Sequence, residues 1–453
     1  MEKKISFTKD QLDAIEAKGR TLLVSAAAGS GKTATLTQRI IHQLRTDPDA
    51  DIERMLIVTF TRAAASELKA RITKVLQQEL SRDPTNDHIR EQLIKAGSAK
   101  ICTIDSFCFD LVKTHFERLD LSPSIRIADD SETEPIRQRI MKQAIEEMYI
   151  ECGQAPDEEH PFAHLENNPF KSFIDSMLNG RNDETLIPLL IKFKEHLNNY
   201  PEGISLLKKS SDQFRQDAAR PFPETLDGKL FISHFEKALD HYKASYEKAA
   251  ALLAETIYAD KFHEHLSQEQ ALLAGMRNAL TDTSMTPGSF CASMEFSFKS
   301  MPSIRDKDAF TEERTNYFKS VRESLKKDLA QWKETYAGLD ADALKKDNEE
   351  TSEDCLLLYR LFSKYEQALS EEYKMLGICS FQDVTGFTLK LLDLPDILEI
   401  WQNRFDSVYI DEYQDVTPVQ DSIFQKLGGA DKRFMVGDMK QSIYAFRGAD
   451  PSL

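Results

Sequence analysis

The segment Ala26-Ala27-Ala28-Gly29-Ser30-Gly31-Lys32-Thr33 constrains the fold of this chain more than any other. It follows residues 21–25, a short apolar run typical of a buried strand, and precedes residues 34–44, which have a helical pattern. Small residues at such a junction let the backbone wrap closely enough for successive N–H groups to surround phosphates at a helix N-terminus. The segment therefore predicts a phosphate-binding loop (P-loop), with Ala at its first position, where Gly is commoner.

A P-loop of this kind predicts ATP and Mg²⁺ as cofactors. Lys32 would contact the β- and γ-phosphates, and the Thr33 hydroxyl would hold the metal ion. The backbone expected to surround the phosphates is that of Ala28, Gly29, Ser30 and Gly31. A glycine-rich turn without a ligand is the structural alternative, and the Lys-Thr pair in register argues against it.

A second acidic site is needed to complete the metal shell and activate water. Asp411-Glu412-Tyr413-Gln414-Asp415 follows directly after the apolar run 407–410. Asp411 suits the Mg²⁺ shell, and Glu412 suits a general base that orients the attacking water. Taken alone, an acidic segment after a strand is as often a loop or a helix cap. Together with the P-loop it predicts a hydrolysis site.

Five short apolar runs predict the strands of an α/β layer with a parallel sheet flanked by helices. They are residues 21–25, 55–60, 100–104, 407–410 and 433–436. Between the third and fourth runs, long charged amphipathic segments predict a large all-helical insertion, for example at 134–149, 232–258 and 320–336. We therefore expect a sheet domain formed by residues 1–125 and 376–453, and a helical insertion domain formed by residues 126–375.

The net charge of −17 counts against a nucleic-acid partner, because counterion release rewards basic surfaces. Residues 1–125, however, carry 19 Lys and Arg against 17 Asp and Glu, whereas residues 126–375 carry 32 against 46, so most of the acidity lies away from the motifs. The sequence shows neither a signal peptide nor an apolar run of about 18 residues. Its six cysteines form no C-x-x-C pair. These features predict a cytoplasmic protein with reduced thiols and no membrane partner.

Six motifs in order resemble those of the UvrD/Rep-type superfamily 1 DNA helicases. They are residues 7–11, the P-loop, Thr59-Phe60-Thr61-Arg62-Ala63-Ala64-Ala65, Thr103-Ile104-Asp105-Ser106-Phe107, the acidic segment 411–415, and residues 436–444. Within that superfamily, residues 25–33 and 126–130 are most similar to the AddA subunits of the AddAB helicase-nucleases. The resemblance implies a RecA-like ATP-binding domain and an ATP-dependent DNA helicase or translocase motor in double-strand-break repair and recombination.

The resemblance also assigns roles to single residues. Gln11 matches the glutamine that reads adenine, although a Gln at a helix start is usually a capping group. Gln441 matches the residue that senses the γ-phosphate. A sequence-independent DNA groove needs aromatic faces and phosphate contacts. The matching residues here are Phe60, Thr61, Arg62, Ser106, Tyr444, Phe446 and Arg447. Core packing is the alternative for Phe60, and it is the favoured reading for Phe107.

Departures from the family pattern qualify these roles. Arg62 stands where the family usually has Asn, and Phe446 stands where many members have Trp. The family's second RecA-like domain, with its transition-state arginines, and the AddA nuclease domain would lie beyond Leu453. We therefore expect the isolated chain to bind nucleotide, to hydrolyse it slowly and not to unwind DNA.

The expected partners are single-stranded DNA, duplex DNA ends and a subunit of the AddB type. The competing hypothesis is a nucleotide-binding scaffold that docks a partner subunit through the acidic insertion without motor activity.

Overall fold

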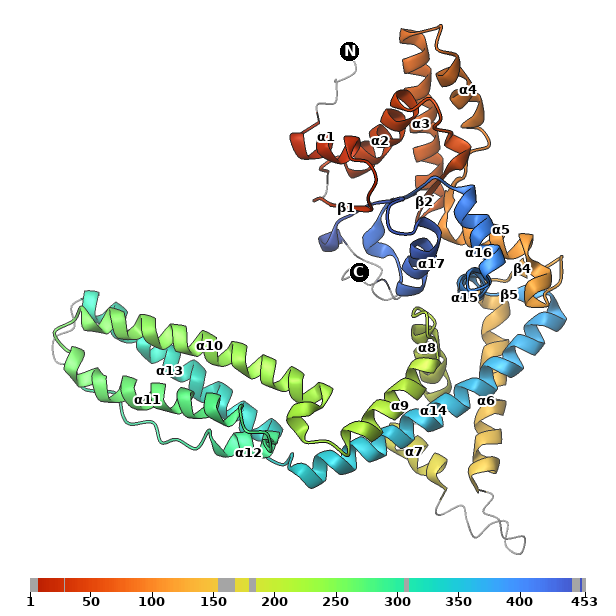
Figure 1. Ribbon diagram of the computed structural model, residues 1–453. Helices are drawn as coiled ribbons and strands as arrows, with labels where there is room; N and C mark the ends of the chain where they lie inside the picture. Colours follow the sequence, from red (N-terminus) through yellow and green to blue (C-terminus); the bar gives the residue numbers. More distant parts are fainter. Residues whose placement is uncertain are drawn as a thin grey trace, which may run out of the picture. The chain divides into compact units, whose positions relative to one another are not determined.

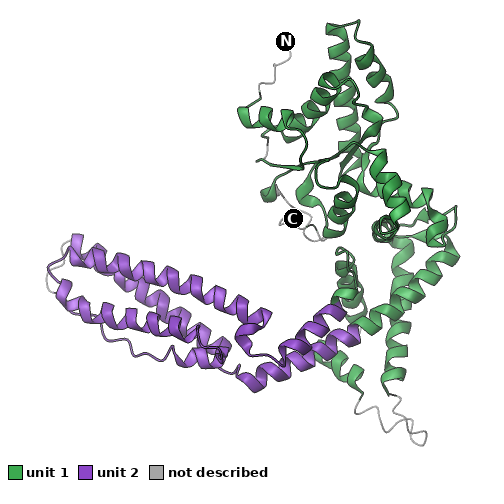
Figure 2. Cartoon of the chain, in the orientation of Figure 1, with its two compact units in different colours: residues 1–206, 359–453 green, residues 207–358 purple. Residues whose placement is uncertain are grey.

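The protein is described by a computed structural model covering residues 7–27, 29–153, 168–178, 185–304, 309–441 and 449. The chain divides into two compact units (Figure 2). Unit 1 comprises residues 1–206 and 359–453, and unit 2 comprises residues 207–358. Both sheets of the described residues belong to unit 1.

A five-stranded parallel sheet forms the centre of unit 1 (Figure 1). Its order is β1 (Leu22–Ser25), β7 (Arg433–Gly437), β6 (Ser407–Ile410), β2 (Met55–Thr59) and β3 (Ile101–Thr103). The five predicted strands and their parallel arrangement are thus confirmed. Because every neighbouring pair is parallel, the carboxyl ends of all five strands lie along one edge.

Alternate residues of the central strands feed two separate cores, as expected for a sheet covered on both faces. On β2, Met55 and Ile57 join the core that includes Leu36 of α2 (Lys32–Thr46). Leu56 and Val58 join the core that includes Phe424 of α17 (Pro418–Gly428). The sheet is therefore fixed from both sides, which holds the loops at its carboxyl edge on a rigid support.

Helices of unit 1 account for both layers around the sheet. Those in the first part of the chain are α1 (Lys9–Glu16), α2 (Lys32–Thr46), α3 (Arg62–Arg82), α4 (Asp87–Lys95) and α5 (Ile104–Thr114). Those in the last part of the chain are α15 (Phe381–Leu392), α16 (Pro395–Arg404) and α17 (Pro418–Gly428). Short 3₁₀ turns are η1 (Ile52–Arg54), η2 (Phe116–Leu119), η6 (Tyr413–Asp415) and η7 (Met439–Gln441).

Two further strands, too short to be predicted from the sequence, form a second parallel sheet. β4 (Arg126–Ile127) pairs with β5 (Ile378–Cys379), and Arg126 lies opposite Ile378. The chain thus leaves the sheet region at β4 and returns to it at the neighbouring β5. In the sequence between these two strands, the helices that contribute to unit 1 are α6 (Asp130–Gly153), α7 (Pro169–Leu178), α8 (Leu186–Leu197), α9 (Ser205–Asp217) and α14 (Ala341–Leu376). The expected boundaries at 125/126 and 375/376 remain a prediction.

Unit 2 has its own core, formed by long helices. They are α10 (Leu226–Ala254), α11 (Ala259–Ala279), α12 (Pro287–Ala292) and α13 (Ala309–Tyr336), with the 3₁₀ turn η5 (Phe222–Glu224). Phe235, Phe262, Phe290 and Phe318 are fully buried in this core. The helical segments predicted at 134–149, 232–258 and 320–336 fall on α6, α10 and α13, with the second ending four residues early. Among the described helices, none has the length and apolar character required to cross a bilayer.

Candidate functional site: the carboxyl edge of the sheet

The P-loop occupies the turn from β1 to α2, as the sequence predicts. Gly29 and Gly31 have φ angles of +72° and +87°, a left-handed backbone that residues with a Cβ rarely adopt. Gly31 is the N-cap of α2, and no side chain caps that end of the helix among the described residues. The first turn of α2, beginning at Lys32, therefore presents backbone N–H groups suited to an anion.

Gln11 joins the N-terminal helix to the P-loop. Its side-chain carbonyl accepts the Thr8 N–H at 2.8 Å, and its amide donates to the Ser30 carbonyl at 2.7 Å. The capping role that the sequence suggests for Gln11 is therefore present, since Thr8 and Gln11 form a reciprocal capping box. The Gln11 amide nitrogen also packs against the P-loop, because a Cβ added at Gly31 would lie 3.5 Å from it. The adenine-reading role remains a prediction.

Thr33 and Asp411 are separated by most of the chain but are in direct contact. The Thr33 hydroxyl donates to the Asp411 carboxylate at 3.1 Å. Asp411 follows β6 directly, and its backbone N–H donates to the Val58 carbonyl of β2 at 3.0 Å. This pair of oxygen donors fits Mg²⁺, which prefers hard oxygen ligands and takes only one or two from the protein beside phosphates. No group of three or more metal-ligating side chains occurs in the described residues.

Burial raises the pKa of Asp411, and the neighbouring Glu412 charge raises it further. The Thr33 hydrogen bond and the Lys32 charge oppose these effects only in part. The ionised form of Asp411 is therefore disfavoured in the ligand-free site. A divalent cation would suit this carboxylate, because the charge of the cation would offset the cost of burying the carboxylate.

The raised pKa has a consequence for stability. A protonated Asp411 stabilises the fold fully below the ordinary value of 3.8, and this contribution is lost as pH rises through the raised pKa. At pH 7, Asp411→Asn should therefore raise the free energy of unfolding of the ligand-free chain by about 0.5–2 kcal/mol. Near pH 3.5 the gain should disappear. Thermal unfolding without nucleotide or Mg²⁺ checks this, with the exposed Asp431→Asn as control. A variant less stable than wild type at both pH values would contradict it.

Glu412 has a strained backbone next to the Asp411 carboxylate. Its φ is +55°, and among the described residues only one other non-glycine residue, Asp120, has a positive φ. The Glu412 N–H donates to Asp411 at 3.1 Å. Such strain persists only where the surroundings fix the conformation, and it is common at active sites.

Sequence reasoning missed Gln414, which lies within the acidic segment and is only 5% exposed. Its amide nitrogen donates to the Glu412 carboxylate at 2.9 Å and to Asp415 at 3.3 Å. Its carbonyl oxygen accepts the backbone N–H of Asp438, just after β7, at 2.8 Å. A glutamine between four acidic and aromatic neighbours gives little signal in a sequence, because its role depends on the approach of another strand.

Four of the residues predicted to contact DNA follow β2 and β3. Phe60 directly follows β2 and is partly buried, and Thr61 caps α3 by accepting the Ala64 N–H at 3.1 Å. Arg62 begins α3 and is exposed. Ser106 lies in the first turn of α5, where its hydroxyl is 2.8 Å from that of Thr103. Their DNA role remains a prediction.

Phe107 is a core residue, as favoured from the sequence. It is fully buried and makes edge-on contacts with Trp401 and Phe405, with ring centroids 5.7 and 6.2 Å apart. The backbone of Gln441 lies in η7, shortly after β7. The Gln441 side chain is not among the parts of the chain that the structure describes. Ala28, Tyr444, Phe446 and Arg447 also lie outside the described residues.

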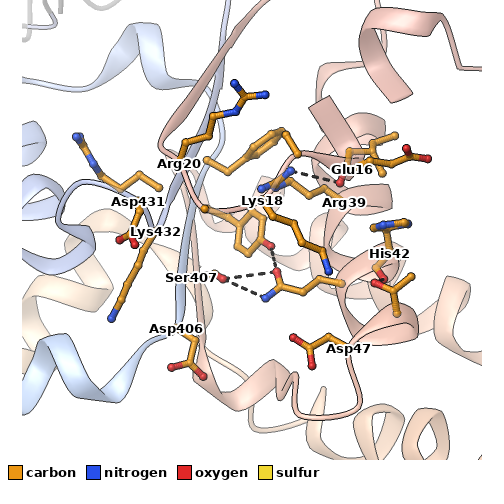
Figure 3. A pocket seen from close by; sticks show the side chains of 18 residues that line it. Glu16, Lys18, Arg20, Arg39, His42, Asp47, Asp406, Ser407, Asp431 and Lys432 are labelled. Atoms are coloured by element: carbon orange, nitrogen blue, oxygen red, sulfur yellow. Dashed lines mark hydrogen bonds between the residues drawn. The ribbon is translucent and has the colours of Figure 1, made fainter. Parts of the chain in front are cut away.

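A pocket of about 320 Å³ lies at the opposite, amino edge of the sheet (Figure 3). Arg39 lines this pocket but has a structural function, because it donates to the Ala14 and Ile15 carbonyls at 2.5 and 3.3 Å. Its guanidinium also lies 4.7 Å from the ring centre of Phe434. Burial lowers the pKa of Arg39 from its ordinary value. None of the P-loop residues lines this pocket, so it is separate from the candidate site.

The strand order arranges the predicted motifs in one row. The P-loop follows β1, Asp438 and η7 follow β7, and the acidic segment follows β6. Of the residues predicted to contact DNA, Phe60, Thr61, Arg62 and Ser106 follow β2 and β3, at the other side of the same edge. Ligands of open parallel sheets bind outside the carboxyl ends of the strands. The arrangement therefore suits nucleotide chemistry at one half of the edge and a second ligand at the other.

Curated relatives match almost the whole chain. It is 32% identical over 466 residues to the ATP-dependent helicase/nuclease A subunit of Geobacillus thermodenitrificans, covering 99% of this chain and 36% of that protein. The A subunits of the same name from Geobacillus kaustophilus and Clostridioides difficile are 33% and 30% identical, again over 99% of this chain and over 36% and 35% of their own lengths. The chain thus spans about a third of the length of these relatives.

The family comparison covers all of the motifs described above. The model of the UvrD/REP helicase N-terminal domain matches residues 7–453, from the helix that carries Gln11 to the end of the chain. The chain therefore belongs to the UvrD/REP helicase N-terminal domain family.

Proposed function

We propose that this chain is the ATP-binding part of an ATP-dependent DNA helicase or translocase motor of the AddA type, acting in double-strand-break repair and recombination. The observation that carries the proposal is the contact between Thr33 and Asp411, which brings the P-loop and the acidic segment together. In this proposal the sheet of unit 1 is a RecA-like domain, and residues 126–375 are its helical insertion. The partners are single-stranded DNA, duplex ends and a subunit of the AddB type.

Each residue of the nucleotide site has a proposed task. Lys32 and the backbone of residues 28–31 bind the phosphates, and Gln11 contacts adenine. Thr33 and Asp411 hold Mg²⁺, which when bound neutralises charge on the β- and γ-phosphates. Glu412 orients the attacking water and accepts its proton. Gln441 senses the γ-phosphate and relays its presence to the DNA contacts.

Equilibrium binding tests this proposal without depending on the rate of turnover. The affinity of the chain for a non-hydrolysable ATP analogue is measured with and without Mg²⁺, and its affinity for a labelled single-stranded oligonucleotide with and without the analogue. A motor part should bind both, and by linkage each ligand should change the affinity for the other by the same factor. Nucleotide binding without any DNA binding would favour a scaffold. Failure to bind nucleotide would refute the proposal.

Arg62 provides a test of the DNA-binding half of the edge. Arg62→Ala should weaken binding of single-stranded DNA and lower the slope of log K against log salt by about 0.7, because one phosphate contact is lost. Anisotropy titrations at several salt concentrations measure both quantities. Arg82→Ala is the matched control, since Arg82 is the last residue of the same 21-residue helix, about 30 Å away. Equal effects of the two substitutions would argue against a DNA contact at Arg62.

A further inference from the structure

We propose that Gln414 is a positioning residue for hydrolysis, which holds the Glu412 carboxylate and ties it to the backbone at the end of β7. This inference rests on the proposed function, because it deepens the role of Glu412 at the same site. One side chain makes both connections: the amide nitrogen reaches Glu412 at 2.9 Å, and the carbonyl oxygen accepts the Asp438 N–H at 2.8 Å.

The position of Gln414 is fixed independently by the strand beside it. A Cβ on Gly437, the last residue of β7, would lie 3.0 Å from the Gln414 side-chain oxygen and 3.2 Å from its backbone nitrogen. Only a bare α-carbon leaves comfortable room for this approach. The Gln414 side chain is also nearly completely buried, so water cannot readily replace any of its hydrogen bonds. Gln414 is therefore held in one orientation, as a positioning residue must be.

The backbone of Glu412 needs such support. Its left-handed φ of +55° sets the direction of the Glu412 side chain, and a glutamate has no intrinsic preference for this backbone conformation. The side chain of Gln414 fixes the carboxylate at one end and the Asp438 N–H at the other. The Asp438 carboxylate in turn accepts the Lys440 N–H at 3.0 Å, within the turn that leads to Gln441. A movement of residues 438–441 is thus passed to Glu412 through a single amide.

In the full chain, two substitutions at Gln414 separate its hydrogen bond to Glu412 from its hydrogen bond to the Asp438 N–H. Gln414→Glu keeps an oxygen for the Asp438 N–H but replaces the donor that faces Glu412. Gln414→Met removes both groups with little change in volume. Gln425→Glu is the matched control, because the Gln425 amide donates to the Asp421 carboxylate at 2.5 Å from an exposed position.

The two readouts are single-turnover ATP hydrolysis and amide hydrogen exchange in the segment containing Asp438. Both Gln414 variants should lower the hydrolysis rate about 10- to 100-fold with nucleotide affinity unchanged. Only Gln414→Met should speed exchange at Asp438, by roughly 2- to 10-fold. The Gln425 control should change neither quantity.

A double-mutant cycle with Glu412→Gln distinguishes positioning from a general structural role. If Gln414 acts through Glu412, then Gln414→Met should cause less than about a twofold further loss in the Glu412→Gln background. Multiplicative losses, or Gln414 variants that hydrolyse ATP at the wild-type rate while Glu412→Gln does not, would overturn this inference alone. A wild-type chain that fails to bind Mg²⁺-ATP would overturn the proposed function as well.

Discussion

Replacing Lys32 with Ala should weaken Mg²⁺-ATP binding by about 30- to 5,000-fold. Lys32 is the first residue of α2, and its charge acts on the buried Asp411 carboxylate of the proposed metal site. Removing one member of a desolvated charge pair costs about 2–5 kcal/mol, because the other charge is left without a partner. In the proposed site the unpaired group would be a phosphate. Titration of a fluorescent ATP analogue with wild-type and variant chains measures the loss directly.

Two further variants make the Lys32 result specific. Lys18→Ala removes an exposed lysine that lines the pocket at the amino edge of the sheet, so it should leave affinity unchanged (Figure 3). Glu412→Gln should bind the analogue as wild type does but lower the hydrolysis rate by about 10²- to 10⁴-fold, because it removes only the proton acceptor. If Lys32→Ala bound the analogue with wild-type affinity, the β1–α2 loop would not be the nucleotide site.

The sequence predicts the sheet and the edge well because their signals are local. β-branched runs fix the five strands, and Gly29, Gly31 and Lys32 mark the one turn that suits phosphates. The rule that parallel strands end at a common edge then brings Asp411 to the P-loop, although some 380 residues separate it from Thr33. The helical pattern of residues 127–374 is equally local.

Features that depend on distant backbone approaches could not be predicted in the same way. β4 and β5 contain two residues each, too few for any periodicity. The role of Gln414 depends on the missing side chain at Gly437. The boundary of unit 2 at residue 358 falls inside the continuous helix α14, where no loop or composition change marks it. The partners of a buried charge such as Arg322 are likewise invisible until the helices are packed.

Arg322→Met should destabilise unit 2 by about 3–5 kcal/mol. Arg322 and Glu269 are each 1% exposed and form a buried ion pair, with the guanidinium donating to the carboxylate at 2.7 Å. Arg322 also donates to the Lys299 carbonyl at 2.8 Å, and the Tyr246 hydroxyl donates to Glu269 at 2.8 Å. The Glu269 carboxylate and the Lys299 carbonyl would each lose a hydrogen bond. Removing one member of a buried pair strands the other charge in a low-dielectric core.

The chain allows this loss to be measured in unit 2 by itself. Its two tryptophans lie one in each unit: Trp332 packs on the core of unit 2, and Trp401 is buried in unit 1. In a Trp401→Phe background, the urea-induced change in fluorescence therefore reports on unit 2. Arg277→Met is the control, because its pair with Asp240 joins α10 to α11 from exposed positions, and it should change stability by less than about 1 kcal/mol.

A combined variant decides why the single substitution is harmful. Arg322→Met, Glu269→Leu and Tyr246→Phe together remove the charges and the hydroxyl while keeping similar volume. If stranded charge causes the loss, this triple variant should recover most of it, because well-packed apolar residues often equal or exceed a buried ion pair in stability. If the loss came instead from the contacts of the Arg322 guanidinium with the rings of Phe298 and Phe318, the triple variant would stay as unstable as Arg322→Met alone.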